Sequence, residues 1–226
     1  APGEFVTVSG GHGAGKSTLL NCVSGAYAPT SGEIWIDGQN VTHMPEHRRA
    51  KLLGRVFQDP MMGTAGNMWI EENLALALRR GQKRGLRWGI TQKEREMFKE
   101  QLRRLDLGLE DRLSTKVKLL SGGQRQALTL LMATLQKPKL LLLDEHTAAL
   151  DPKTARKVLE LSEQIIEEHG LTSLLVTHNM RDAIRYGNRL IMMHDGRVAV
   201  DVSGEEKKKL TVEALLERFS ESAGSD

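Results

Sequence analysis

Apolar residues follow two patterns along this chain: short continuous runs, and longer stretches with one apolar face. Continuous runs occupy residues 4–10, 139–145 and 172–178, and runs of this length are typical of buried strands. The stretches at 16–25 and 151–170 have helical periodicity and each closes on a glycine, which predicts helices. Strands that alternate with helices predict an α/β fold with a mostly parallel sheet covered on both faces.

Other segments predict the smaller parts of the fold. Residues 32–38 alternate and end in an Asp-Gly turn, which predicts a short strand. Residues 189–200 hold a second Asp-Gly between apolar runs, which predicts a hairpin. Residues 51–60 are a further apolar segment that stops at Pro60. Residues 211–220 predict a short amphipathic helix. A small antiparallel β part therefore accompanies the parallel sheet.

The middle of the chain differs in character. Residues 70–81, 91–107 and 121–136 all show helical periodicity, and no convincing strand lies among them. This predicts an all-helical subdomain over residues 59–129, inserted into a core formed by residues 1–58 and 130–226. We expect one domain over residues 1–226.

Composition sets outer limits on function. The 226 residues carry a formal net charge of +3, too small by itself to indicate nucleic-acid binding, and 4% aromatic residues argue against a base-stacking surface. The single cysteine, Cys22, excludes an internal disulfide and fits a reducing compartment. The longest apolar run is too short to span a bilayer.

A basic run in the helical part leaves two interpretations open. It could contact phospholipid headgroups or nucleic acid, or it could be a solvated loop between two helices. The glycines within it, at positions 81, 85 and 89, favour the loop. The run consists of Arg79, Arg80, Lys83, Arg84 and Arg87, with Trp88 beside it.

A glycine-rich segment with a strand before it and a helix after it carries the clearest chemistry. It matches the pattern G-x-x-x-x-G-K-[ST] without a mismatch, and such a loop turns backbone N–H groups and a helix N-terminus toward phosphate. Lys16 would bridge the β- and γ-phosphates, and the Ser17 hydroxyl would bind Mg²⁺. The predicted nucleotide-binding residues are Gly10, Gly11, His12, Gly13, Ala14, Gly15, Lys16, Ser17 and Thr18.

Polar residues at the ends of other predicted strands complete a hydrolytic site. Asp144 and Glu145 end a buried strand, and because side chains alternate along a strand we expect them to point differently. Asp144 would hold Mg²⁺, and Glu145 would polarise the attacking water. His178 ends the next predicted strand and could orient Glu145. Gln58 lies near the end of the apolar segment at 51–60, just before the helical part, and could reach Mg²⁺ or water.

A second glycine-rich helix start raises a question. Ser121, Gly122 and Gly123 open the predicted helix at 121–136, in the arrangement that offers backbone N–H groups to an anion. The chain already has one loop of that kind, and residue patterns alone do not explain two.

The order of these motifs resembles the ATP-binding cassette (ABC) family: GGHGAGKST, FQDP, LLSGGQRQ, LLLLDEHTAALD and VTH. The resemblance covers essentially the whole chain and implies a P-loop NTPase core with a helical subdomain, binding ATP and Mg²⁺. It also implies that two cassettes dimerise head to tail, so that Ser121, Gly122, Gly123 and Gln124 serve the partner's nucleotide. Asp151 matches the loop that crosses the dimer interface. ATP would then hold the dimer together, and hydrolysis would weaken it.

The chain departs from the family pattern at a few positions. Gly11 and His12 stand where serine and asparagine are more usual, and neither position needs its side chain to cradle phosphate. His146 replaces a usual proline, and we expect a modest effect on the turn. The family places an adenine-stacking aromatic on strands upstream of the loop, and this sequence begins after them, so we expect weak base recognition here.

Most members of the family are motor subunits of membrane transporters. The resemblance implies a second ATPase subunit, a separate transmembrane permease that docks after Gln58, and an extracytoplasmic solute-binding protein. The segments at 66–81 and 144–155 are similar to cassettes of binding-protein-dependent importers, with amino acids as the favoured cargo. The alternative is an ABC-type ATPase acting on ribosomes or nucleic acid. Such proteins carry two cassettes or a long coiled coil, and neither is present here.

Overall fold

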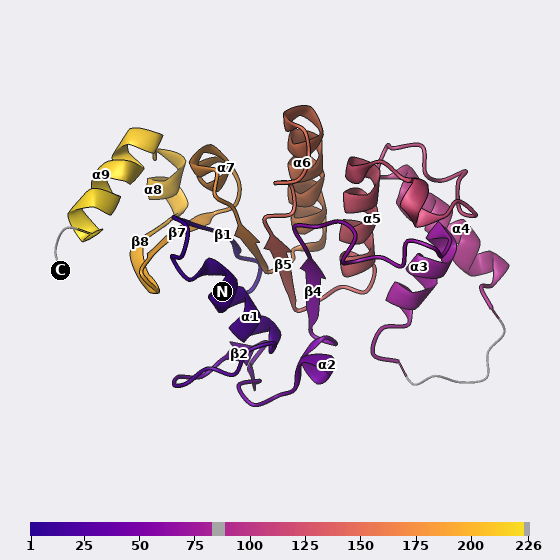
Figure 1. Cartoon of the computed structure of the whole chain (residues 1–226), viewed down its shortest axis with the longest axis horizontal. Coiled ribbons are helices and arrows are strands. Elements are labelled where there is room, and N and C mark those ends of the chain that lie inside the picture. Colours follow the sequence, from indigo (N-terminus) through magenta and orange to yellow (C-terminus); the bar gives the residue numbers. More distant parts are fainter. Residues whose placement is uncertain (83–88, 224–226) are drawn as a thin grey trace.

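The computed structural model describes residues 1–82 and 89–223, and its centre is a six-stranded sheet of order β4-β5-β6-β1-β7-β8 (Figure 1). All neighbouring strands pair in parallel except β7 and β8, which form the predicted hairpin. The predicted mostly parallel sheet is thus confirmed. The strands are β1 (Phe5–Gly10), β4 (Leu53–Val56), β5 (Leu140–Asp144), β6 (Ser173–Val176), β7 (Arg189–His194) and β8 (Arg197–Ser203).

Helices cover both faces of the sheet because the central strands are apolar on both sides. Leu142 of β5 packs with Leu20 of α1 (Lys16–Ser24), whereas Leu141 and Leu143 pack with Leu159 of α6 (Pro152–His169). This is the period-2 alternation of a strand buried on both faces. Figure 1 shows α1 and α6 on opposite sides of the sheet.

The carboxyl ends of the parallel strands meet at one edge, as the topology requires. β1 ends in the glycine-rich loop at Gly10, β5 ends at Asp144, and in the register Asp144 lies beside Val176 of β6. β4 ends at Val56, just before Gln58. The fold therefore gathers the predicted phosphate loop, carboxylates, histidine and glutamine along a single edge.

The helical part has its own apolar core. It contains α3 (Ile70–Leu78), α4 (Gln92–Arg103), a 3₁₀ turn (Val117–Leu119) and α5 (Gly122–Thr134). Helix α5 belongs to two cores, because Leu128 packs into the helical cluster and Leu130 into the cluster beneath the sheet. The predicted limit at residue 129 falls inside α5, so the helix itself joins the two parts.

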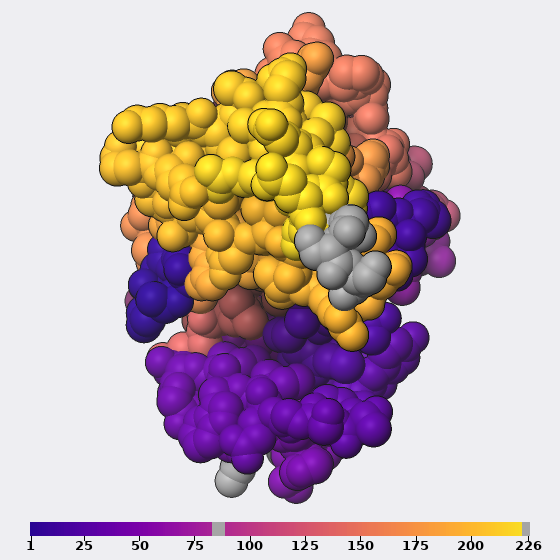
Figure 2. All heavy atoms as spheres, turned by 90° about the vertical axis from the view of Figure 1, so that its left-hand side faces the viewer, coloured from indigo at the N-terminus to yellow at the C-terminus, as the bar shows by residue number. Residues whose placement is uncertain are grey.

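Several short elements were missing from the sequence prediction. The turn at residues 37–38 exists, with φ of 51° at Asp37 and 73° at Gly38, but the strands it joins pair only two residues each. The strand predicted within residues 32–38 is β2 (Trp35–Ile36), whereas the elements that the prediction missed are β3 (Gln39–Asn40), α2 (Glu46–Arg49), α7 (Met180–Arg185) and α8 (Gly204–Lys208). The predicted C-terminal helix is α9 (Val212–Ala223), and Figure 2 shows this C-terminal segment covering one end of the molecule.

The structure describes only part of the basic run. Arg79 pairs with Glu94 of α4 at 3.0 Å, and Arg80 donates hydrogen bonds of 3.4 Å to the carbonyl oxygens of Ala133 and Gln136. These two arginines therefore join α3 to α4 and to the end of α5. Lys83, Arg84, Arg87 and Trp88 lie outside the described residues. Among the residues that are described, no helix has the length and apolarity needed to cross a membrane.

Candidate functional site

The glycine-rich loop between β1 and α1 curls around the ammonium group of Lys16. The Lys16 Nζ atom donates hydrogen bonds of 2.8 Å to the Gly10 carbonyl and 2.9 Å to the Gly11 carbonyl. Gly10, with φ of 147°, packs so closely that a Cβ would lie 2.4 Å from the Met193 carbonyl oxygen. No heavy atom would lie within 4 Å of a Cβ on Gly11 or Gly13, so this side of the loop is open to a phosphate.

The three residues predicted to hold Mg²⁺ are Ser17, Gln58 and Asp144, and all three carry the oxygen atoms that this ion prefers. Ser17 and Thr18 are exposed in the first turn of α1. Gln58 and Asp144 line a cavity of about 500 Å³ between α1, the segment after β4 and the segment after β5. Mg²⁺ prefers a few protein oxygens with the remaining ligands from phosphate and water. No group of three His, Cys, Asp or Glu residues suited to a metal occurs in the part of the chain that is described.

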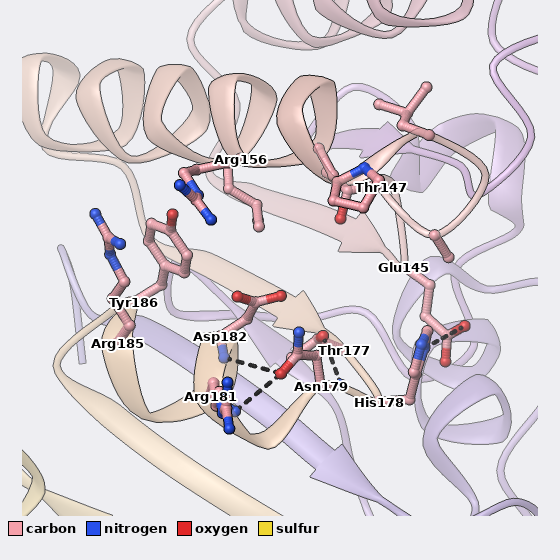
Figure 3. Close-up of a pocket in the computed structure, with 15 residues that line it drawn as sticks. Glu145, Thr147, Arg156, Thr177, His178, Asn179, Arg181, Asp182, Arg185 and Tyr186 are labelled. Carbon is pink, nitrogen blue, oxygen red and sulfur yellow. Dashed lines mark hydrogen bonds and ion pairs between the residues drawn. The ribbon is translucent and has the colours of Figure 1, made fainter.

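Glu145 and His178 lie opposite one another at the ends of β5 and β6 (Figure 3). The Glu145 Oε2 atom is 3.5 Å from the His178 Nδ1 atom, and Glu145 is 23% exposed. Strand β5 ends at Asp144, and Glu145 takes the left-handed backbone conformation, with φ of 45°. The two carboxylates therefore make separate contacts, Asp144 with Arg55 and Glu145 with His178. The left-handed conformation of Glu145, which is uncommon for a residue other than glycine, is part of what separates them.

The pocket beside this pair is large and mostly polar. It has a volume of about 530 Å³, with Glu145 and His178 at one end. Arg156, Asp182 and Tyr186 lie at the other end in Figure 3. Burial raises the pKa of the Asp182 carboxyl above its usual value.

The second glycine-rich segment forms the N-terminus of α5. The Ser121 Oγ atom accepts a 3.2 Å hydrogen bond from the Gln124 backbone N–H, and the Gln124 Oε1 atom accepts one of 3.1 Å from the Ser121 N–H. This reciprocal capping box fixes the helix start. Ser121 and Gly122 are exposed, whereas Gly123 is buried against α6, where a Cβ would lie 2.3 Å from the Thr154 Cγ2 atom.

Asp151 caps α6 next to this segment. Its Oδ1 atom accepts a 3.1 Å hydrogen bond from the Thr154 backbone N–H, and the hydrogen bonds to Thr154 lower the pKa of the Asp151 carboxyl. Thr154 also packs against Gly123. Asp151, the residue predicted at the dimer interface, is therefore linked through Thr154 to the second glycine-rich segment.

The two glycine-rich helix starts lie at different places on the sheet. Helix α1 follows β1 directly, whereas α5 packs against β4, and β5 and β6 separate these two strands. The two helices also pack on opposite faces of the sheet, because Leu20 of α1 shares a cluster with Leu142 and Leu130 of α5 shares one with Leu141 and Leu143. Within this chain, the segment at residues 121–124 and the loop at residues 10–17 therefore do not share one phosphate.

His146 has a larger structural role than the modest turn effect expected from the sequence. It is 1% exposed, and its Nε2 atom lies 2.9 Å from the Ser162 Oγ atom of α6. The Gln126 Nε2 atom donates to the His146 carbonyl at 2.6 Å and to the Phe57 carbonyl at 2.8 Å. Gln126 therefore ties α5 to the residue before Gln58 and to the residue after Glu145. Sequence analysis missed this role of Gln126, and the only hint in the sequence is a polar residue within an apolar stretch.

The buried imidazole of His146 predicts a specific acid sensitivity. Burial lowers its pKa from 6.5 to about 4, so the neutral form is favoured in the folded chain. Its contribution to stability is complete above pH 6.5 and is lost as the pH falls toward 4. Relative to a His146→Gln variant, the wild type should lose about 3 kcal/mol of unfolding free energy between neutral pH and pH 4. Urea unfolding at several pH values measures this difference, and parallel pH curves would contradict it.

Comparison with known proteins gives consistent matches. Residues 1–148 match the sequence profile of the family described as ABC transporter. The chain is 48% identical over 217 residues to a tyrosine transport ATP-binding protein of Clostridioides difficile (strain R20291), covering 96% of this chain and 86% of that protein. It is 37% identical over 199 residues to the methionine import ATP-binding protein MetN of Corynebacterium jeikeium (strain K411), covering 87% of this chain and 51% of MetN. The dimeric post-hydrolysis structure of the ATP-binding cassette MJ0796 bound to ADP and Pi is similar with a TM-score of 0.75 at 33% identity, covering 90% of this chain and 86% of that one.

Proposed function

Since this chain belongs to the ABC transporter family and is an ATPase of that family, we propose that it is the motor subunit of a membrane importer. The observation that carries the proposal is the separation of its two glycine-rich helix starts across the sheet. Each would be half of a nucleotide site, so a complete site needs two chains. The dimeric state of the similar cassette MJ0796 bound to ADP and Pi supports this arrangement.

The phosphate-loop half of the site would hold the nucleotide. The backbone N–H groups of residues 11–17 and the Lys16 ammonium would bind the β- and γ-phosphates. Ser17, Gln58 and Asp144 would hold Mg²⁺, whose charge offsets the negative charge of the phosphates. Glu145 would accept a proton from the attacking water, and His178, at 3.5 Å, would keep the Glu145 carboxylate in place.

The other half would come from the partner. Ser121 and Gly122 are exposed, and the N-terminus of α5 carries a partial positive charge that favours a γ-phosphate. Because the helix start is fixed by its capping box, the segment at residues 121–124 would arrive already ordered. Asp151 would lie at the same dimer interface, next to the segment at residues 121–124. Nucleotide would then close the dimer, and loss of the γ-phosphate would open it.

A separate transmembrane subunit would dock on the helical part. Met61 and Met62, three and four residues after Gln58, are 61% and 68% exposed, and Trp69 at the start of α3 is 43% exposed. Exposed methionine and aromatic side chains are typical of surfaces that receive an apolar helix. A permease docked here would place this chain at the membrane surface. A solute-binding protein on the far side would complete the system.

We propose an amino acid as the cargo, with tyrosine as the first candidate. The relative at 48% identity is named for tyrosine transport, and the MetN relative is named for methionine import. Deleting the gene for this chain from its source cells should reduce uptake of radiolabelled tyrosine to background, with methionine and thiamine uptake unchanged. The wild-type chain should restore uptake and the Glu145→Gln variant should not. Unchanged tyrosine uptake, or loss of uptake of another solute alone, would contradict the proposed cargo, and restoration of uptake by the Glu145→Gln variant would contradict the motor role.

A further inference from the structure

Arg55 of β4 makes an unusual set of contacts behind the proposed metal site. Its Nη2 atom donates hydrogen bonds of 3.0 Å to the Asp144 Oδ2 atom and 3.1 Å to the Asn21 Oδ1 atom. Its Nη1 atom donates one of 3.2 Å to the Ser24 Oγ atom. The guanidinium carbon lies 4.7 Å from the centroid of the Phe57 ring. These contacts hold the arginine on several sides, and its side chain is 18% exposed.

The contacts of Arg55 join the three segments that carry the proposed magnesium ligands. Asn21 and Ser24 belong to α1, whose first turn carries Ser17. Asp144 ends β5, and Arg55 itself lies three positions before Gln58. Arg55, Gln58 and Asp144 line the same cavity. One guanidinium therefore reaches every segment on which the proposed site depends.

We propose that Arg55 is a positioning residue for the metal ligand Asp144, which extends the function proposed above. By holding Oδ2, the guanidinium fixes the rotamer of the Asp144 carboxylate and leaves Oδ1 available to Mg²⁺ or its water shell. The contacts to Asn21 and Ser24 fix that carboxylate relative to the helix of Ser17. Hydrogen-bonded partners that orient a ligating carboxylate contribute strongly to metal affinity.

Arg55 also has an electrostatic effect on Mg²⁺ affinity, which is opposite in sign to its positioning effect. A guanidinium beside Asp144 reduces the negative potential that attracts Mg²⁺, so its removal could strengthen metal binding. Asp144 is 20% exposed and Arg55 is 18% exposed, so solvent partly screens that charge effect. A directional hydrogen bond is not weakened by solvent in the same way. The positioning effect of Arg55 therefore outweighs its electrostatic effect, and removal of Arg55 should weaken Mg²⁺ binding.

The test is the gain in nucleotide affinity that Mg²⁺ provides. Calorimetry measures the Kd of the non-hydrolysable analogue AMP-PNP in EDTA and with excess Mg²⁺, and the ratio of the two values reports metal binding in the complex. Arg55→Met should leave the EDTA value unchanged and lower the ratio about tenfold. Arg55→Lys, which keeps the charge but cannot make the same set of hydrogen bonds, should lower the ratio by a smaller factor.

Control variants separate this inference from the proposed function. Arg95→Met removes another partly exposed ion pair, with Glu71 at 2.8 Å in the helical part, and should leave the ratio unchanged. Asp144→Asn should lower the ratio, and combining it with Arg55→Met should add little, because both changes remove one interaction. An unchanged ratio in Asp144→Asn would overturn the proposed metal site itself.

If Asp144→Asn lowers the ratio, the Arg55 variants decide the inference. An unchanged ratio in Arg55→Met, or a raised one, would overturn the positioning role. A loss of affinity in EDTA as large as the loss in Mg²⁺ would overturn it as well, because Arg55 would then support the phosphate loop in general. Should Arg55→Met fail to fold, Arg55→Lys gives the same decision.

Discussion

Replacing Glu145 by glutamine is expected to stop ATP turnover while ATP remains bound between two chains. Glutamine keeps the size of the side chain and a carbonyl oxygen facing His178, whose Nδ1 atom lies 3.5 Å from the present carboxylate. The amide cannot accept a proton from water. Loss of a general base lowers turnover by about 10²–10⁴-fold, whereas the groups proposed to bind phosphate are untouched.

Two measurements check this expectation together. A phosphate-release assay should show the loss of turnover, and light scattering after size exclusion should show a stable dimer in saturating Mg-ATP. Glu160→Gln is the matched control, because Glu160 pairs with Arg185 at 3.6 Å and has no proposed role in hydrolysis. A Glu145→Gln variant that stays monomeric with ATP would contradict the shared site. Turnover at the wild-type rate would contradict the role of Glu145.

The sequence predicted the framework of this site because its signals are local. The continuous apolar runs at 4–10, 139–145 and 172–178 became β1, β5 and β6. Since these strands are parallel, their carboxyl ends meet, and the phosphate loop, Asp144 and His178 come to one edge without any further information. Glycines that close helices were equally informative, as at Gly170 after α6.

The residues that sequence analysis missed act through partners far along the chain. Arg55 and Asp144 are separated by 89 positions, and Gln126 reaches the Phe57 carbonyl across 69. No local periodicity marks such a pair, because the contact exists only after β4, β5 and α5 have packed. His146 illustrates the same limit. Its replacement of a proline was visible in the sequence, whereas its burial against Ser162 depends on α6.

Short elements were missed for a different reason. Strand β3 has two residues, and α7 has six, which is less than two helical turns. Elements of this length show too few repeats for periodicity to be recognised. The turn chemistry of Asp37 and Gly38 was the stronger signal there, and the structure confirms it.

Replacing Lys16 by alanine should remove nucleotide binding. The Lys16 ammonium donates to the Gly10 and Gly11 carbonyls, at 2.8 and 2.9 Å, and lies inside the loop that would receive the phosphates. Loss of charge-assisted hydrogen bonds to phosphate should weaken ATP binding about 100-fold or more. Calorimetry with ATP measures this, and Lys139→Ala is the control because Lys139 pairs with Asp37 outside the site. Unchanged affinity in Lys16→Ala would contradict the phosphate-loop assignment.

The Lys16→Ala chain should nevertheless retain its other half-site. Gly122 is exposed, and a Cβ there would meet only Leu150, at 3.2 Å, so Gly122→Asp should fold while placing a negative charge toward the partner's nucleotide. Each variant alone should be inactive. In an equal mixture half of the dimers are mixed, and each mixed dimer pairs one intact phosphate loop with one intact segment at residues 121–124. The mixture should therefore recover about a quarter of wild-type turnover. Mixed dimers that stay inactive would contradict this expectation, because one complete nucleotide site would then not suffice for turnover.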